Sequence, residues 1–370
     1  MALIVVAFGL PLAHLSHDRL RTPRVDTTSE GWQHRLDALA RARVFFGDPP
    51  AVDSLDLARN VRADAPFEPG ASLECHYEPD ETSGTTPKFD CRLPSGEVIK
   101  VKYGINREIP GEAAATHLLA AMGFGADYVS VAERVRCYGC PRSPYRSRQI
   151  AEWFFVAGVL DRFLDYGRYA DFARPAVERK LEWRAVEVDE AEGFGWYELS
   201  RVDASRGGAG RAELDAFRLM AVFLAHWDNK ATNQRIVCIG ERGEDGPEPC
   251  ASPLLMIQDA GGTFGPRKVD HQGWAGAPIW RDAEGCAVSM ATLPHEGATF
   301  PDAEISEEGR RLLADRLGAL TSDQITALFR SSNFPDARTG RPGAADVSPW
   351  VETFQRKVGE IASRRCAPAR

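Results

Sequence analysis

The spacing of hydrophobic positions predicts a strand-rich first part of the chain and a helix-rich second part. Alternating apolar residues, bounded by polar or Gly/Pro-containing stretches, indicate strands. Apolar residues three or four positions apart indicate helices. The predicted strands are 73–78, 89–93, 98–103, 235–239 and 254–258, and the predicted helices are 31–46, 111–124, 211–226 and two that begin after Ser306 and Thr321.

Composition narrows the function classes without naming one. The 370 residues are 44% hydrophobic and 26% charged, which is typical of a globular protein and excludes a disordered chain. A net charge of −8 argues against a dedicated nucleic-acid binder. The basic residues are nearly all arginine, since only seven lysines occur, so each lysine is a candidate for a role that needs lysine.

The N-terminus and the cysteines favour export. Residues 2–15 are almost wholly apolar, a length that suits a secretory leader and is short of the roughly 20 residues of a membrane span. No other stretch predicts a stable membrane span. A buried strand or helix is the alternative interpretation of 2–15. Eight cysteines are an even number, as disulfides require, so a periplasmic or secreted location is favoured, with the cytoplasm as the alternative.

Two cysteine pairs are predicted to be adjacent or bridged. Cys75 and Cys91 lie on neighbouring predicted strands, and Cys238 and Cys250 flank a predicted hairpin. The motif Cys137-Tyr-Gly-Cys140 leaves three alternatives open: a bridge, half of a zinc site or a redox pair.

The first candidate site lies in the strand-rich part. The loop between two strands holds small and hydroxyl residues that let backbone N–H groups approach a phosphate. Its candidate residues are Ser83, Gly84, Thr85, Thr86 and Lys88. In the strand at 98–103, alternation places Lys100 and Lys102 on the same face, and Glu112 in the next helix can pair with one of them.

The second candidate site follows the predicted helix 211–226. The chain there reads His226-Trp-Asp228-Asn-Lys230-Ala-Thr-Asn233, and a later apolar strand ends in Gln-Asp259-Ala-Gly. This order resembles the catalytic loop H-R-D-x-K-x-x-N of protein kinases followed by D-F-G. The chain looks like an atypical member, and the candidates are the HipA type, the secretory-pathway kinases and the aminoglycoside-phosphotransferase type. The loop at 82–88 is most similar to the short phosphate loop of the HipA type, which has a Pro-Lys pair.

The resemblance implies a bilobal α+β fold with a small β-rich lobe and a larger, mainly helical lobe. It divides the chain into a leader and linker at 1–30, a first helix and nucleotide-binding lobe at 31–155, and a catalytic lobe at 156–370. Over most of its length the chain also resembles a family of bacterial proteins, which implies no function.

The resemblance also implies an enzyme, a kinase that uses ATP and Mg²⁺ to phosphorylate a hydroxyl of an unidentified protein or small molecule. Asp228 would accept the hydroxyl proton, and Lys230 would reach the transferred phosphate. Asn233 and Asp259 would hold the metal, and Lys102 or Lys100, positioned by Glu112, would bind the α- and β-phosphates.

Four features depart from the kinase pattern. No G-x-G-x-x-G loop is present, no arginine follows His226, Ala260 stands where the kinase phenylalanine would be, and no A-P-E segment is evident. Two alternatives therefore stay open. One is a pseudokinase or nucleotide-binding module without turnover, and the other is an exported cysteine-rich protein with metal or redox chemistry.

Overall fold

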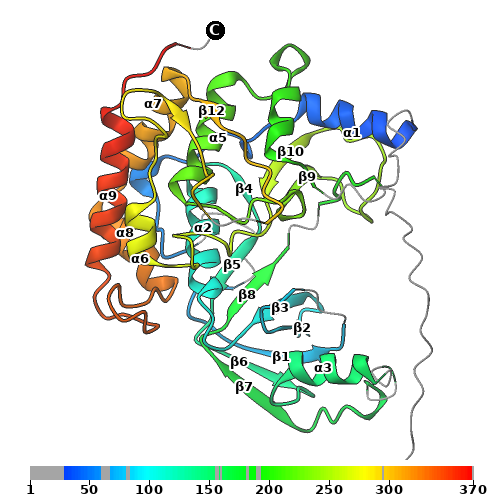
Figure 1. Ribbon diagram of the computed structural model, residues 1–370. Coiled ribbons are helices and arrows are strands. Elements are labelled where there is room, and N and C mark those ends of the chain that lie inside the picture. Colours follow the sequence, from blue (N-terminus) through cyan, green and yellow to red (C-terminus); the bar gives the residue numbers. More distant parts are fainter. Residues whose placement is uncertain are drawn as a thin grey trace, which may run out of the picture.

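The protein, seen in a computed structural model, has one lobe built on a large sheet and one lobe that is mainly helical (Figure 1). The structure describes residues 29–59, 67–80, 84–154, 158, 161–180, 183–188, 193–293 and 296–368. The predicted α+β fold with a smaller sheet-rich lobe is confirmed. The apolar segment 2–15 and nearly all of the predicted linker lie outside the described residues.

The small lobe is a seven-stranded sheet with the order β5-β8-β3-β2-β1-β6-β7. Its strands are β1 (Ser72–Glu78), β2 (Lys88–Arg92), β3 (Val98–Lys102), β5 (Tyr128–Val131), β6 (Arg134–Tyr138), β7 (Tyr169–Ala173) and β8 (Ala176–Arg179). β1 and β6 are parallel, and the other neighbours are antiparallel. Helix α3 (Pro144–Trp153) packs beside β2 in the lower part of Figure 1.

Alternation along β3 gives the sheet one apolar and one polar face. Ile99 and Val101 are fully buried in the apolar face, with Phe89 of β2 beside them. The alternate residues, Lys100 and Lys102, point to the opposite face, since side chains alternate along a strand. The polar face of β3 is therefore the face that can carry a charged site.

Helix α2 (Glu108–Ala121) joins the two lobes. Every residue of α2 is buried, as is expected of a helix covered on all sides. It packs on β5 of the small lobe and on α8 (Ser322–Ser331) of the large lobe. Acidic residues in its first turns are consequently held between the sheet and the second half of the chain.

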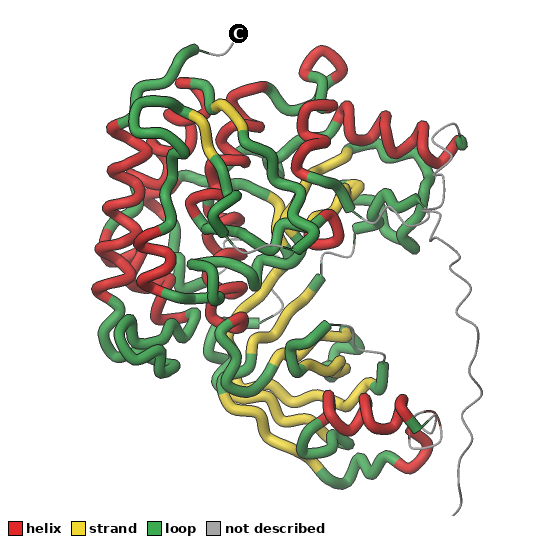
Figure 2. The backbone as a smooth tube through the Cα atoms, viewed as in Figure 1, coloured by secondary structure: helices red, strands yellow, loops and turns green. Residues whose placement is uncertain are grey.

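The large lobe holds most of the helices, drawn red among green loops in the upper part of Figure 2, and in it α5 packs on α7. Its remaining α-helices are α1 (Glu30–Arg41), α5 (Arg211–Phe223), α6 (His271–Gly276), α7 (Glu307–Gly318) and α9 (Ser348–Ser363). Its strands are β4 (Gly125–Ala126), β9 (Gln234–Cys238), β10 (Pro253–Ile257), β11 (Ala287–Val288) and β12 (Ala303–Glu304). Short 3₁₀ helices, one of them in the small lobe, cover Val52–Ser54, Asp161–Phe163, Trp196–Arg201, Ala204–Arg206 and Ala231–Asn233.

The packing moves the lobe boundary away from residue 155. β7 and β8 lie beyond that position, yet they pair with β6, β3 and β5 of the small-lobe sheet. α1 lies before it, yet it packs on β10 and on Trp196–Arg201 of the large lobe. A buried ion pair fastens α1 to the large lobe, because Arg35 of α1 donates two 2.9 Å hydrogen bonds to Glu198.

All eight cysteines are paired, and the two predicted pairs are confirmed. The Cα atoms are 5.6 Å apart in Cys75–Cys91 and 5.4 Å apart in Cys238–Cys250. Cys137–Cys140 is also a bridge, which was one of the three alternatives for this motif. The fourth pair, Cys286 and Cys366, joins the residue before β11 to the segment after α9. In the part of the chain that the structure describes, no helix is long and apolar enough to span a membrane.

Candidate functional site

A buried ion pair between β3 and α2 forms one side of the candidate site. Both carboxylate oxygens of Glu112 lie 2.6 Å from Nζ of Lys102. Glu178 of β8 lies 3.1 Å from the same nitrogen. The sequence left Lys100 and Lys102 as alternatives, and the geometry singles out Lys102 as the lysine that Glu112 holds. Glu178 was missed because β8 joins β3 only in the folded sheet.

Neighbouring charges, together with burial, decide the protonation states of Lys102, Glu112 and Glu178. Burial opposes the charged form of Lys102, but Glu112, Glu178 and Asp259 together raise the pKa of its ammonium well above the usual value. Burial raises the pKa of Glu112, while the Lys102 ammonium, 2.6 Å from both of its oxygens, opposes that rise and favours the carboxylate. The pKa of Glu178 is lowered because Lys102 and Lys100 outweigh its burial. Lys102 is therefore a fixed cation at neutral pH.

The loop after α5 carries the motif that begins at His226, and it is held rigidly. Ala225 turns the chain with a positive φ of 50°. His226 is fully buried, and burial lowers the pKa of its imidazole to about 4, so the ring is neutral at pH 7. Asn229 donates to the carbonyl of His226 and accepts from the backbone N–H groups of Thr299 and Phe300. These contacts fix the loop between two parts of the large lobe.

Asp228, Lys230 and Asn233 come together on this loop. The side-chain amide of Asn233 donates a 2.6 Å hydrogen bond to the backbone carbonyl of Asp228. Nζ of Lys230 lies 3.4 Å from Oδ1 of Asp228. The Asp228 side chain is 27% exposed and that of Lys230 is 46% exposed, so both can meet a molecule from solvent.

Asp259 follows β10 and reaches the same place. Its backbone N–H and that of Gln258 donate to the carbonyl of Asn233 at 3.2 and 2.9 Å. Its Oδ1 accepts a 2.9 Å hydrogen bond from the N–H of Gly261. A Cβ at Gly262 would lie 2.6 Å from Cβ of Asp228, so glycine is required where the two segments meet. Asp228 and Asp259 are thus neighbours, although 31 positions separate them.

Asp259 is an anion at neutral pH. Burial favours its neutral form, but Lys102, the Gly261 N–H and Lys268 lower the pKa of the carboxyl below its usual value. Among the described residues, no donor contacts Oδ2 of Asp259 or Oδ1 of Asn233. Carboxylate and amide oxygens are ligands that Mg²⁺ prefers, so this donor set fits a magnesium ion.

The predicted phosphate loop reaches the polar face of the sheet. Ser83 lies outside the described residues, while Gly84 (φ +81°) and Thr85 are exposed. Thr86 is buried, and its hydroxyl donates a 2.7 Å hydrogen bond to Oε2 of Glu108. Lys88 is paired with Lys102 across β2 and β3. Burial and the neighbouring lysines lower the pKa of Lys88.

Glu108 and Lys268 are two further residues of this site that the sequence analysis missed. Nζ of Lys268 lies 2.5 Å from Oε2 of Glu108, the oxygen that also accepts from Thr86. Their separation of 160 positions left no local signal except that Lys268 is one of the seven lysines.

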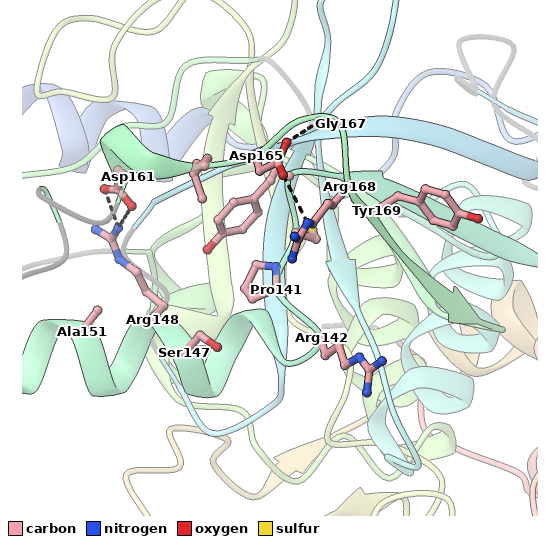
Figure 3. Close-up of a pocket in the computed structure, with 14 residues that line it drawn as sticks. Pro141, Arg142, Ser147, Arg148, Ala151, Asp161, Asp165, Gly167, Arg168 and Tyr169 are labelled. Atoms are coloured by element: carbon pink, nitrogen blue, oxygen red, sulfur yellow. Dashed lines mark hydrogen bonds and ion pairs between the residues drawn. The ribbon is translucent and has the colours of Figure 1, made fainter.

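A hollow of about 710 Å³ lies elsewhere on the small lobe, beside α3 and β7 (Figure 3). Two of its three arginines have acidic partners: Arg148 is paired with Asp161 at 2.9 Å and Arg168 with Asp165 at 3.2 Å. Cys140 lines it but is bridged. The third arginine, Arg142, also lines the hollow, which holds none of the residues of the predicted phosphate loop or catalytic loop.

Comparisons with known proteins add little to this geometry. No family model matches the chain, and no curated protein matches it. Among solved structures, the chain is similar to the proinflammatory kinase CtkA of Helicobacter pylori, with 10% identity over 79% of this chain and 94% of that one. The TM-score of 0.39 is too low for this similarity to support a function, so the function proposed below depends on the site itself.

Proposed function

We propose that the protein is a kinase-like phosphotransferase that moves the γ-phosphate of ATP to a hydroxyl group. The observation that carries the proposal is that Lys102, held by Glu112, lies near Asp259, while Asp259 lies against Asp228 and Asn233. Phosphoryl transfer depends mainly on positioning and on neutralising charge. A fixed cation, two oxygen ligands and a carboxylate that solvent can reach are the groups that such a reaction needs.

Each residue has a distinct role in this proposal. Lys102 binds the α- and β-phosphates, and Glu112 keeps its ammonium in place. Asp228, on the exposed loop, orients the acceptor hydroxyl and takes its proton, and Lys230 attracts the transferred phosphate. Asn233 and Asp259 would hold Mg²⁺, which neutralises phosphate charge when bound.

The remaining phosphate-loop residues, Gly84 to Thr86 with Lys88, approach the phosphates in the proposed complex. The acceptor is a protein or a small molecule, since no contact of the site selects between them. We also infer that the protein resides in an oxidising compartment. Four cysteine pairs lie at disulfide-bonding distance, and disulfides form and persist in such compartments.

A nucleotide-binding module without turnover is the second candidate. It is favoured by the absence of a G-x-G-x-x-G loop from the sequence. Binding and turnover therefore need separate measurements.

The test is transfer of labelled phosphate from ATP, with Mg²⁺, by the oxidised full-length protein alone and with host lysate. The parent should transfer label, and Asp228→Asn should lose at least about 100-fold in rate, since general bases contribute roughly 10²–10⁴. Asp315→Asn, which changes an exposed aspartate of α7, is the matched control and should behave as the parent. Binding of Mg·ATP without transfer would favour the module, and absence of both would exclude either function.

A further inference from the structure

One carboxylate, that of Glu108, connects three segments of the candidate site. It lies in the first turn of α2 and is 6% exposed. Its Oε2 accepts the Thr86 hydroxyl at 2.7 Å and the Lys268 ammonium at 2.5 Å. Asn106 supports the arrangement, because its side chain accepts from the Glu108 N–H and donates to the Thr86 hydroxyl. The phosphate loop and the segment after Asp259 are thus joined through one internal anion.

The backbone around Lys268 is strained in a way that keeps this lysine at the site. Lys268 and Val269 have φ angles of +54° and +46°. Such angles are unfavourable for residues with a side chain, above all for β-branched valine, and persist only where surrounding contacts hold them. Here the holding contact is α2: a Cβ at Gly111 would lie 2.9 Å from a methyl group of Val269. Strain of this kind concentrates at functional sites.

Lys268 also acts on the proposed metal ligand. Its charge is one of the influences that lower the pKa of Asp259. A Cβ at Gly261 would lie 2.3 Å from Cγ of Glu108 and 3.2 Å from Oδ1 of Asp259, so the two acids flank the same glycine. The Lys268 side chain is 30% exposed, whereas that of Lys102 is almost fully buried. A phosphate near Asp259 would therefore meet Lys268 from the solvent side.

We propose that Lys268 binds a phosphate of the nucleotide, and that Glu108 occupies Lys268 and Thr86 until the nucleotide displaces it. The inference rests on the proposed function and adds two residues to its binding site. An ammonium and a hydroxyl are donors that suit phosphate oxygens, and a carboxylate is the protein's own substitute for such an anion. Glu108 and the nucleotide compete for these donors, so Glu108 lowers the affinity for nucleotide while Lys268 raises it.

Calorimetric titration of Mg·ATP into the oxidised full-length protein tests these opposite effects. Lys268→Met should raise the Kd about tenfold or more, as expected for the loss of a charged hydrogen bond, and Lys268→Arg should stay within about threefold. Glu108→Gln should lower the Kd about threefold, because its neutral amide competes less well. Arg311→Met is the matched control; it removes the cation of an exposed ion pair on α7 and should leave the Kd unchanged.

A double variant separates a phosphate contact from a side effect of the freed carboxylate. If Lys268 contacts phosphate, Glu108→Gln combined with Lys268→Met should bind clearly more weakly than Glu108→Gln alone. If the double variant regains that affinity, the loss came from the unpaired Glu108 charge and the inference is wrong.

Three other outcomes are informative. A parental Kd in Lys268→Met overturns the inference while the proposed function stands. If Lys268→Met and Glu108→Gln weaken Mg·ATP binding equally, the Glu108–Lys268 ion pair only supports the fold of the site, and the inference is also overturned. If the parent binds no Mg·ATP, the proposed function fails, and the inference fails with it. Circular dichroism checks folding, and Lys268→Gln replaces Lys268→Met if the latter does not fold.

Discussion

Replacement of Lys102 by methionine should destabilise the protein strongly and in a pH-dependent way. Lys102 is 4% exposed, and its ammonium is the shared partner of Glu112 and Glu178 at 2.6 and 3.1 Å. Lys102→Met leaves both carboxylates buried without that cation. Removing one partner of a buried ion pair costs about 3–5 kcal/mol, so the free energy of unfolding should fall by that amount at pH 8.

The loss should shrink as the pH is lowered. Without Lys102, burial raises the pKa of Glu178 in the folded protein above its value in the unfolded chain, near 4.3. A group of this kind favours the folded state below its unfolded pKa, and this contribution is lost as the pH rises through the folded pKa. One proton corresponds to about 1.36 kcal/mol per pH unit, so the penalty can change by up to about 4 kcal/mol between pH 8 and pH 5.

Urea unfolding followed by circular dichroism at pH 5, 6.5 and 8, without reductant, measures the effect. Lys180→Met is the control, since Lys180 is an exposed lysine that follows β8, and it should cost less than about 0.5 kcal/mol. Adding Glu112→Gln to Lys102→Met should recover part of the loss at pH 8. A penalty below about 1 kcal/mol at pH 8, or one that does not change with pH, would refute the reasoning.

Three further predictions concern other parts of the molecule. Asp259→Asn should weaken Mg²⁺-dependent ATP binding measured by calorimetry, whereas Asp228→Asn should abolish turnover and leave binding within a few-fold; the reverse result would exchange their roles. Burial lowers the pKa of His117 to about 4, so between pH 7 and pH 5 the unfolded chain takes up a proton that the folded protein refuses. The free energy of unfolding of the parent should therefore fall by about 2 kcal/mol between pH 7 and pH 5, and this fall should be absent in His117→Gln. If urea unfolding gives the same pH dependence for parent and variant, the lowered pKa of His117 is contradicted. Replacing Cys286 and Cys366 by serine opens a cross-link with a sequence separation of 80 and should lower the unfolding free energy by about 4 kcal/mol, unless thiol counting of the parent finds no bridge there.

Local patterns in the sequence were enough to predict the strands next to the site. β1, β2 and β3 begin and end within one residue of the predicted segments, because alternation and turn residues are local signals. The Lys102–Glu112 pair could be predicted as one of two alternatives for the same reason, since strand and helix follow each other in the chain. The neighbourhood of Asp228 and Asp259 was predicted through the motif order.

Pairing between distant segments could not be predicted in this way. Glu178 contacts Lys102 because β8 returns to β3 after a stretch whose pattern gave no strand signal. The contact between Glu108 and Lys268 depends on how the segment after β10 folds back on α2. The pairing of β7 and β8 with the small-lobe sheet, beyond residue 155, could not be predicted either. The pairing between strands is decided by the folded core rather than by the spacing of residues within each strand.

The distribution of lysine connects composition to chemistry. Of the seven lysines in the chain, five are at the candidate site: Lys88, Lys100, Lys102, Lys230 and Lys268. An ammonium is compact and offers three donors in any direction, so it fits between Glu112 and Glu178 where a planar guanidinium would need more room. In the proposed complex, the same property would let Lys268 move from the Glu108 carboxylate to a phosphate oxygen without reorienting a rigid group. Lys102, which is shared between two carboxylates, shows directly how a small cation serves two anions at this site.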